Sequence, residues 1–215
     1  MKRKLGWMFV FFLLLPLIGF ISTTYLVSNG KVLPFDEHAI NWVKTIETPA
    51  LTKVMLFFSH LGSTGPVIVI SCMFLIIIYI LYRKFDEVVL FVIASLGSTG
   101  INQGLKFLFK RDRPLEQIVK ETGFSYPSGH TMAAVTLYGI IVFLFWRHIK
   151  TVRGRTMLIL FSSLMIIIIG FSRIYLRVHY PSDIIGAFLL SGIWLYLNIW
   201  TYQYLMEKRY DKEKK

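Results

Sequence analysis

The sequence predicts an all-α protein whose chain crosses a membrane six times, with short amphipathic helices on the membrane surface between the first and second crossings. Hydrophobic residues make up 55% of the 215-residue chain, and charged residues only 17%. A soluble domain with this composition would be difficult to keep in solution. The charged residues gather in clumps between long apolar stretches. We therefore expect a single integral membrane domain over residues 1–215.

Six apolar stretches approach the roughly 20 residues that a helix, rising about 1.5 Å per residue, needs to cross the hydrocarbon core. They run from Leu5 to Val27, Pro66 to Tyr82, Val88 to Phe109, Ser128 to Trp146, Thr156 to Leu176 and Pro181 to Tyr204. The first stretch follows basic residues, as in a secretory signal, but no small-x-small cleavage pattern comes after it. We interpret it as an uncleaved first span.

The segment between the first two spans has the periodicity of an amphipathic helix. Apolar and polar residues there follow helical spacing, with Ile40, Val43 and Ile46 set against Glu37, Asn41, Lys44 and Glu47. Asp36 is a candidate N-cap for this helix. Residues from Ala50 to Leu61 form a second, more apolar piece of the same surface layer. The alternative is one long second span that begins near Ala50 and is kinked by Pro66.

The pentapeptide LGSTG occurs twice, at residues 61–65 and 96–100. Small residues let neighbouring membrane helices approach each other closely. We interpret both copies as packing motifs rather than as loops that bind phosphate.

The distribution of basic residues predicts the orientation. With six spans, the two termini and two of the connecting loops lie on one side and hold 14 of the 24 Lys and Arg residues: Lys2, Arg3, Lys4, Arg83, Lys84, Arg147, Lys150, Arg153, Arg155, Lys208, Arg209, Lys212, Lys214 and Lys215. The positive-inside rule makes that side cytoplasmic. The net charge of +12 thus reflects basic residues placed beside the membrane rather than a surface that binds nucleic acid. We expect a multi-pass protein of the cell membrane, with neither nucleic acid nor a protein partner implied.

Three stretches place charged groups close to the hydrocarbon, where each costs about 2.5–3.5 kcal/mol at the bilayer centre. They are KFLFKRDRP at residues 106–114, YPSGH at 126–130 and SRIYLRVHYPSD at 172–183. Counting the spans brings all three to the outer face of the membrane. We therefore expect a single site on the extracytoplasmic side.

These stretches resemble the three-part signature of the type 2 phosphatidic acid phosphatase superfamily. The matching positions are Lys106, Arg113 and Pro114, then Pro127, Ser128, Gly129 and His130, then Ser172, Arg173, His179 and Asp183. The match shows no departure at a signature position. Within the family, the chain is most similar to small bacterial lipid phosphatases that act on phosphatidylglycerol phosphate and on undecaprenyl pyrophosphate.

The residue types fit phosphoryl transfer, which requires positioning and positive charge around the phosphoryl oxygens. Lys106, Arg113 and Arg173 supply that charge. The sequence YPS opens two of the spans, and both openings have the features of helix N-termini, which favour anions. Gly129 allows close approach of a phosphate oxygen to the backbone, and the Ser128 hydroxyl is either an added donor or only a helix cap.

The resemblance implies a role for each remaining residue. His179 is the nucleophile that forms a phosphohistidine, and Asp183 orients its ring. His130 protonates the departing lipid oxygen and then activates water. The resemblance also implies that neither a metal nor a cofactor is needed. Arg111 and Arg177 lie outside the signature, and we expect them to contact lipid headgroups.

The expected activity is hydrolysis of a membrane lipid phosphate. Phosphatidylglycerol phosphate is the first choice of substrate, followed by undecaprenyl pyrophosphate and phosphatidic acid. Two alternatives remain. One is a lipid phosphotransferase that passes the phosphoryl group from His179 to an acceptor other than water. The other is a transporter of phosphorylated lipids, although the chain lacks the two matching halves with broken helices that are typical of transporters.

Overall fold

The computed structural model describes residues 13–213, and every regular element within that range is a helix. The eight helices are α2 (Leu15–Ser28), α3 (Leu33–Thr45), α4 (Pro49–Leu61), α5 (Thr64–Tyr82), α6 (Phe85–Phe109), α7 (Gly129–Trp146), α8 (Val152–Tyr175) and α9 (Pro181–Glu213). The expected all-α class is therefore confirmed. The beginning of the expected first span, residues 5–12, lies outside the described residues.

Four helices, α6 to α9, are long and apolar enough to cross a membrane by themselves. A fifth crossing is possible if α4 and α5, which meet at 56°, are counted as one bent span. Helix α2 is apolar but has only 14 described residues. The described residues thus support four or five spans, and the expectation of six is not decided by them.

The break between α4 and α5 lies at Gly62 and Ser63, whereas the alternative of one long second span placed a kink at Pro66. Pro66 lies in the first turn of α5, where its missing N–H costs no intrahelical hydrogen bond. The break makes α4 a separate helix, but the pair also satisfies the criteria for one bent span, so the two interpretations are not distinguished. The bounds of α4 match the expected piece from Ala50 to Leu61 within one residue.

Helix α3 is the expected amphipathic surface helix, and its Ile40 and Val43 are buried. The expectation for Asp36 was wrong, because this residue lies within the first turn of α3 and is fully buried. The helix begins earlier than expected because Pro34 occupies its first turn, where proline is well tolerated. Asp36 therefore turns into the protein instead of capping its own helix.

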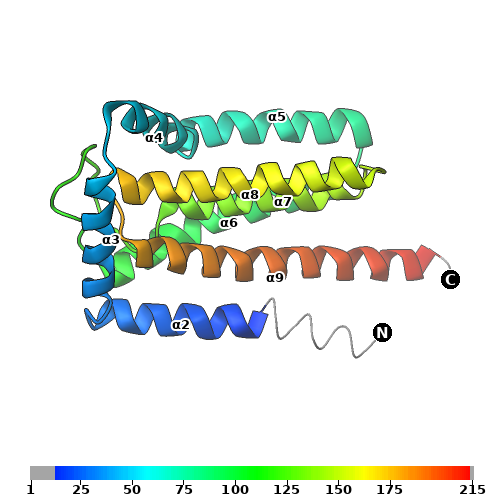
Figure 1. The fold of residues 1–215 in the computed structure, drawn as a ribbon. Coiled ribbons are helices and arrows are strands. Elements are labelled where there is room, and N and C mark those ends of the chain that lie inside the picture. Colours follow the sequence, from blue (N-terminus) through cyan, green and yellow to red (C-terminus); the bar gives the residue numbers. More distant parts are fainter. Residues whose placement is uncertain (1–12, 214–215) are drawn as a thin grey trace.

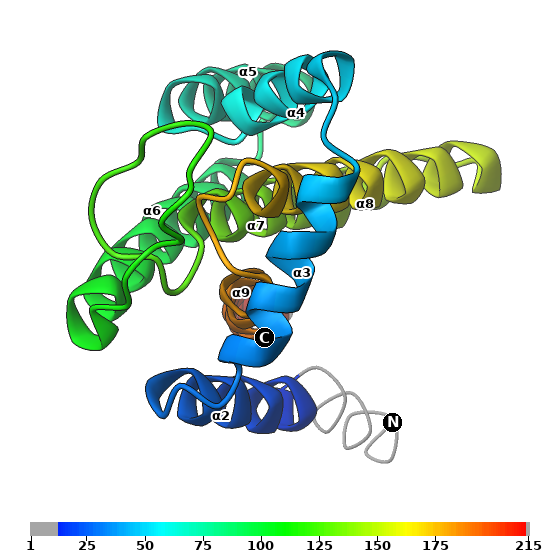
Figure 2. The ribbon, with the colours of Figure 1, turned by 60° about the vertical axis from the view of Figure 1, so that its left-hand side comes forward.

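Helices α2 and α5 to α9 run side by side, and α3 lies across one end of this bundle (Figure 1). Turning the molecule shows α3 crossing over the ends of α8 and α9 (Figure 2). The end that α3 covers also holds the last turns of α6 and α8 and the first turns of α7 and α9 (Figure 1). The α5–α6 and α7–α8 connections and the C-terminal end of α9 lie at the opposite end.

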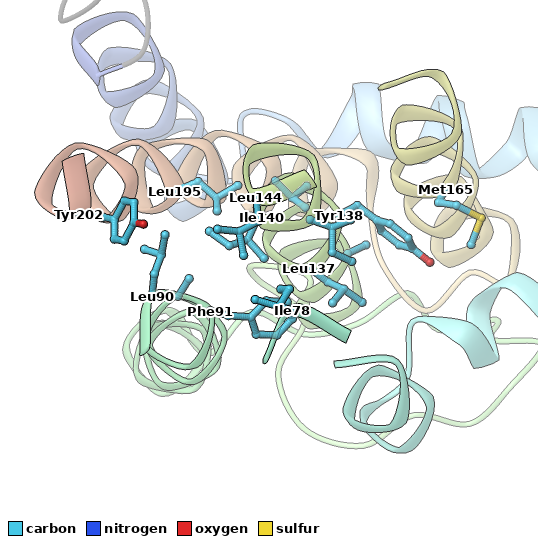
Figure 3. Packing of buried hydrophobic residues seen from close by; sticks show 14 of the residues in the cluster. Ile78, Leu90, Phe91, Leu137, Tyr138, Ile140, Leu144, Met165, Leu195 and Tyr202 are labelled. Carbon is cyan, nitrogen blue, oxygen red and sulfur yellow. The ribbon is translucent and has the colours of Figure 1, made fainter. Parts of the chain in front are cut away.

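The apolar core surrounds α7, the most buried of the four long spans. Ile78 of α5, Phe91 of α6 and Leu137 and Ile140 of α7 point toward one another in this core (Figure 3). Because its centre is closely packed, the bundle provides a rigid base for the polar residues at its covered end.

Close packing of α6 on α9 explains one of the small residues in the second LGSTG copy. A Cβ atom on Gly97 would come within 2.2 Å of the Trp194 ring, whereas one on Gly100 would meet no atom within 4 Å. The Trp194 indole N–H donates to the carbonyl oxygen of Ala94 at 2.8 Å. The packing interpretation therefore holds for Gly97 but does not extend to Gly100.

Candidate active site

A buried histidine and carboxylate lie at the covered end of the bundle. His179 is in the connection between α8 and α9, and Asp183 is in the first turn of α9, so the two are one helical turn apart. Nδ1 of His179 lies 3.3 Å from Oδ2 of Asp183. The Tyr180 N–H donates to that oxygen at 2.8 Å, and the Ser125 hydroxyl donates to it as well. The carboxylate is thus held firmly beside one ring nitrogen of His179.

The other ring nitrogen of His179 faces a guanidinium group. Nε2 lies 3.4 Å from Nη1 of Arg113. Since a guanidinium can only donate hydrogen bonds, the network assigns the lone pair to Nε2 and the proton to Nδ1, beside Asp183. Burial lowers the pKa of His179 to about 4, although Asp183 acts in the opposite direction. At neutral pH, His179 therefore presents an uncharged, nucleophilic Nε2.

Backbone carbonyl groups hold Arg113 in place. Its Nη1 donates to the Val178 oxygen at 2.8 Å, and its Nε donates to the Gly123 oxygen at 3.0 Å. These contacts tie the 110–128 segment to the connection that carries His179. The expected convergence of Arg113 and His179 is therefore present in the structure.

Arg173 is buried near the end of α8, and its Nη1 donates to the Ser59 hydroxyl of α4. Its Nη2 lies 2.5 Å from Oε1 of Glu121. Within the described part of the chain, the buried Nε of Arg173 has no hydrogen-bond partner. One donor of this guanidinium is thus buried without an acceptor in that part of the chain.

Helix α7 begins at the same place. Ser128 is its N-cap, and the Ser128 oxygen accepts from the backbone N–H of Thr131 at 3.4 Å and from its hydroxyl at 3.1 Å. Ser128 is fully buried, so the structure shows the capping function, and direct binding of phosphate by its hydroxyl stays a prediction. A Cβ atom on Gly129 would lie 3.0 Å from Oδ1 of Asn102 and 4.0 Å from Nζ of Lys106.

Asn102 of α6 is a site residue that the sequence reasoning missed. Its side-chain NH₂ donates to the Pro127 carbonyl oxygen at 3.0 Å. This bond fixes the start of α7 against the helix that carries Lys106. Only its position one turn before Lys106, within an apolar stretch, could have indicated such a role.

A cleft of about 640 Å³ opens beside these groups. Among its lining residues are Lys106, Arg113, Gly129, His130 and His179, which places both histidines and two of the three expected cations on one cavity. The cleft continues between α5, α6 and α7 as far as Leu75 and Phe91, where its lining is apolar. From Lys106 to Phe91 this corresponds to about 22 Å along α6.

The sequence profile of the PAP2 superfamily matches residues 87–207, which is more than half of the chain. The chain belongs to the PAP2 superfamily. The three parts of the expected signature all lie within the matched region.

Three relatives of known name are similar to this chain. Phosphatidylglycerophosphatase B of Bacillus subtilis (strain 168) is 29% identical over 197 residues, covering 88% of this chain and 90% of that protein. An undecaprenyl-diphosphatase of Sulfolobus acidocaldarius is 25% identical over 194 residues, covering 86% and 87%. The phosphatidylglycerophosphatase B of Escherichia coli (strain K12) is 36% identical over 84 residues, which cover 39% of this chain and 31% of that protein.

Two solved structures show the same fold. The crystal structure of a transmembrane PAP2 type phosphatidylglycerolphosphate phosphatase from Bacillus subtilis superposes with a TM-score of 0.81 at 24% identity, covering 94% of this chain and 96% of that one. Aquifex aeolicus LpxE gives a TM-score of 0.60 at 24% identity, covering 77% and 94%. With its apolar helices and its membrane relatives, the chain is a multi-pass PAP2 phosphatase.

Glu121 is a further group at the PAP2 site that the sequence reasoning did not identify. The Glu121 carboxylate binds Arg173 and lies 3.7 Å from Nη2 of Arg113. Glu121 also lines the cleft. Burial alone would raise the pKa of Glu121, but the Arg173 guanidinium outweighs this and lowers it. The Glu121 carboxylate is therefore anionic and pairs with both guanidinium groups.

The expectation that Arg111 and Arg177 contact headgroups was wrong. Arg111 binds Asp183 and Asp36, and its side chain is only 11% exposed. Arg177 binds Glu47 at 2.6 Å and donates from Nε to the Glu116 carbonyl oxygen. Both guanidinium groups find carboxylates within the protein because α3 and the residues that follow it cover this end of the bundle (Figure 2).

No group of three or more His, Cys, Asp or Glu side chains that could hold a metal ion occurs among residues 13–213. The groups that face the cleft at its polar end are instead cations, two imidazoles and one carboxylate. This donor set fits an anion rather than a divalent cation.

Proposed function

We propose that this PAP2 phosphatase removes the terminal phosphoryl group of a membrane lipid through a phosphohistidine at His179. The observation that carries the proposal is the orientation of His179, with Nδ1 beside Asp183 at 3.3 Å and Nε2 beside Arg113 at 3.4 Å, next to an apolar cleft. A neutral imidazole held by a carboxylate and aimed at fixed cations is suited to attack phosphorus.

In the first step, Nε2 of His179 attacks phosphorus, and the bond from phosphorus to the lipid oxygen breaks. The electron pair of that bond stays with the oxygen, which takes a proton from His130. Asp183 stabilises the positive charge that forms on the His179 ring. Arg113, Arg173 and Lys106 stabilise the negative charge on the phosphoryl oxygens, with added help from the N-terminus of α7.

In the second step, water attacks the phosphohistidine. His130, now neutral, takes a proton from this water, and the bond between phosphorus and Nε2 breaks. Inorganic phosphate leaves, and both histidines return to their starting protonation states. Each step is supported by positions of this chain's own residues, so the proposed reaction requires no metal.

The cleft supports a lipid as the substrate. Its apolar part lies between α5 and α6, and the lining residues Ile68, Leu96 and Phe107 are 55%, 69% and 66% exposed on the outside of the bundle. A hydrocarbon tail can therefore enter sideways while the phosphate reaches the cations. The name of the Bacillus subtilis relative, which matches over 88% of this chain, favours phosphatidylglycerol phosphate, and the name of the Sulfolobus acidocaldarius relative supports undecaprenyl pyrophosphate as the second candidate. Phosphatidic acid is the third candidate.

We further propose six spans, with both termini in the cytoplasm and the site at the outer face. Arg83 and Lys84 follow α5, and Arg147 and Lys150 follow α7, at the end of the bundle opposite the site. Clustered basic residues of this kind mark the cytoplasmic side. The first apolar stretch of the sequence, from Leu5 to Val27, is long enough for the first span.

The test is release of inorganic phosphate by the purified protein in nanodiscs that contain one of the three candidate lipids. We expect the wild type to release phosphate without an added acceptor, with the highest kcat/KM for phosphatidylglycerol phosphate. His179→Ala should abolish the release. If none of the three lipids releases phosphate, the proposed function is refuted.

The same assay separates the two alternatives. A phosphotransferase would consume the lipid phosphate only when an acceptor alcohol is added, and the acceptor would carry the phosphoryl group. A transporter would move labelled lipid across a vesicle membrane equally well in the wild type and in His179→Ala, without releasing phosphate.

A further inference from the structure

A chain of buried charged groups connects Asp183 to the surface helix α3. Nη1 of Arg111 lies 2.6 Å from Oδ1 of Asp183, the oxygen that does not face His179. Nη2 of the same guanidinium lies 2.7 Å from Oδ2 of Asp36. Asp36 is fully buried although it belongs to the amphipathic helix that lies across the end of the bundle (Figure 2).

Further contacts fix the orientation of Arg111. Nη1 also donates to the Ser182 hydroxyl at 2.7 Å, and the guanidinium lies 4.4 Å from the centre of the Tyr180 ring. Asp36 in turn accepts from the Ser182 backbone N–H at 3.0 Å and from its hydroxyl at 2.6 Å. The planar guanidinium is thus held between two carboxylates and beside an aromatic ring, with little freedom to turn.

Burying a carboxylate is costly unless it is paired and hydrogen-bonded, so Asp36 would be an unfavourable residue in a helix that served only as a cover. All its contacts converge on Arg111 and on the residue next to Asp183. These contacts therefore determine where the first turn of α9 lies and how the Asp183 carboxylate is turned.

We propose that Arg111 and Asp36 are positioning residues of the phosphatase: Asp36 orients Arg111, and Arg111 holds Asp183 so that Oδ2 faces Nδ1 of His179. This inference rests on the function proposed above. Neither residue lines the cleft, so both act through Asp183 without touching the lipid. Helix α3 is by this account part of the catalytic apparatus.

The simplest rival is that Asp36 only fastens α3 to the bundle. The structure provides a matched comparison, because Glu47, just after α3, binds Arg177 at 2.6 Å. That pair also joins the surface layer to the connection between α8 and α9, but its partners do not include Asp183 or His179. Glu47→Gln therefore removes a fastening of the same chemical type and leaves the histidine pair alone.

The experiment compares Asp36→Asn with Glu47→Gln in nanodiscs, using steady-state phosphate release from the lipid that the wild type prefers. Asp36→Asn keeps the side-chain shape but removes the charge that orients Arg111. A misplacement of about 1 Å costs on the order of 100-fold in rate, so we expect kcat to fall by about 10- to 100-fold. KM should stay within about twofold, because the cleft is unchanged. Glu47→Gln should change neither constant.

A second variant and a binding measurement guard against misfolding. Arg111→Lys keeps the buried charge, but a single ammonium cannot bridge both carboxylates as the planar fork does, so its kcat should fall in the same way. Protection of each variant by orthovanadate against thermal unfolding reports an intact site. If orthovanadate no longer protects Asp36→Asn, the kcat of Arg111→Lys is used for the comparison with Glu47→Gln instead.

The inference is overturned if either protected variant keeps the wild-type kcat, or if Glu47→Gln loses kcat to the same extent. It is also overturned if the loss appears in KM alone, because that would place Asp36 in lipid binding. Failure of the wild type to release phosphate from any lipid would instead refute the proposed function, and the two failures are thus distinguishable.

Discussion

Glu121 provides the sharpest test of how the site binds an anion. Its carboxylate lies 2.5 Å from Nη2 of Arg173 and 3.7 Å from Nη2 of Arg113, where a phosphoryl group is expected to bind. A ligand must therefore displace this carboxylate before it can use Arg173 fully. We expect Glu121→Gln to strengthen the binding of phosphate and its analogues, although it removes a polar group from the site.

The magnitude follows from the contact that is lost. A hydrogen bond to a charged group contributes about 1.5–3 kcal/mol to stability. The Glu121 side chain is 28% exposed, so solvent screening reduces this, and we take about 1–2 kcal/mol. Since a tenfold change in affinity corresponds to about 1.4 kcal/mol, orthovanadate should bind about 5- to 30-fold more tightly to the variant.

The assay is inhibition of lipid phosphate hydrolysis by orthovanadate in nanodiscs, compared among the wild type, Glu121→Gln and Glu116→Gln. Glu116 lies in the same segment, but it pairs with Lys44 at 2.7 Å on the exterior of the protein. The Glu116 variant should have the wild-type inhibition constant. An unchanged or weaker inhibition of Glu121→Gln would show that the carboxylate does not compete with the ligand.

Three other predictions concern the histidines and the packing. With an aryl phosphate, whose leaving group needs little protonation, His130→Ala should retain some labelled phosphoenzyme and His179→Ala none; equal labelling would contradict the assigned roles. Because catalysis needs a neutral His179 with a pKa of about 4, the acid limb of the kcat/KM profile should lie near pH 4, and an acid limb near the ordinary value of about 6.5 would contradict this. Gly97→Ala should lower the free energy of unfolding by about 1–3 kcal/mol through the clash with Trp194, whereas Gly100→Ala should not lower it; equal effects in thermal unfolding would exclude the packing explanation.

The helices and the signature residues were predictable from local sequence. Apolar stretches of nearly membrane length predicted α6 to α9, because the length of a span is set by the bilayer rather than by tertiary contacts. The boundaries agree within four residues except at the end of α9, which continues to Glu213 instead of ending at Tyr204. His130 and His179 could be assigned to one site because counting spans determines which helix ends meet. In the structure both residues line one cleft, whereas the number of spans stays a prediction.

The groups that support the signature residues could not be found in the same way. Asp36 and Glu121 look like ordinary surface acids in a sequence, since their partners Arg111 and Arg173 lie 75 and 52 residues away. Neither helical periodicity nor motif spacing carries information over such separations. Nothing in the sequence indicates that Asp36 is buried, because a charged carboxylate is usually exposed. Only the fold shows which residues offset the cost of burying it.

The sideways opening of the cleft between α5 and α6 has a kinetic consequence. A substrate that enters from within its own leaflet meets the enzyme by two-dimensional diffusion, so its relevant concentration is its mole fraction among the surrounding lipids. Adding inert lipid at a constant amount of substrate should slow turnover, even though the bulk concentration does not change. In a cell, the rate of such an enzyme would follow the composition of the surface in which it is embedded.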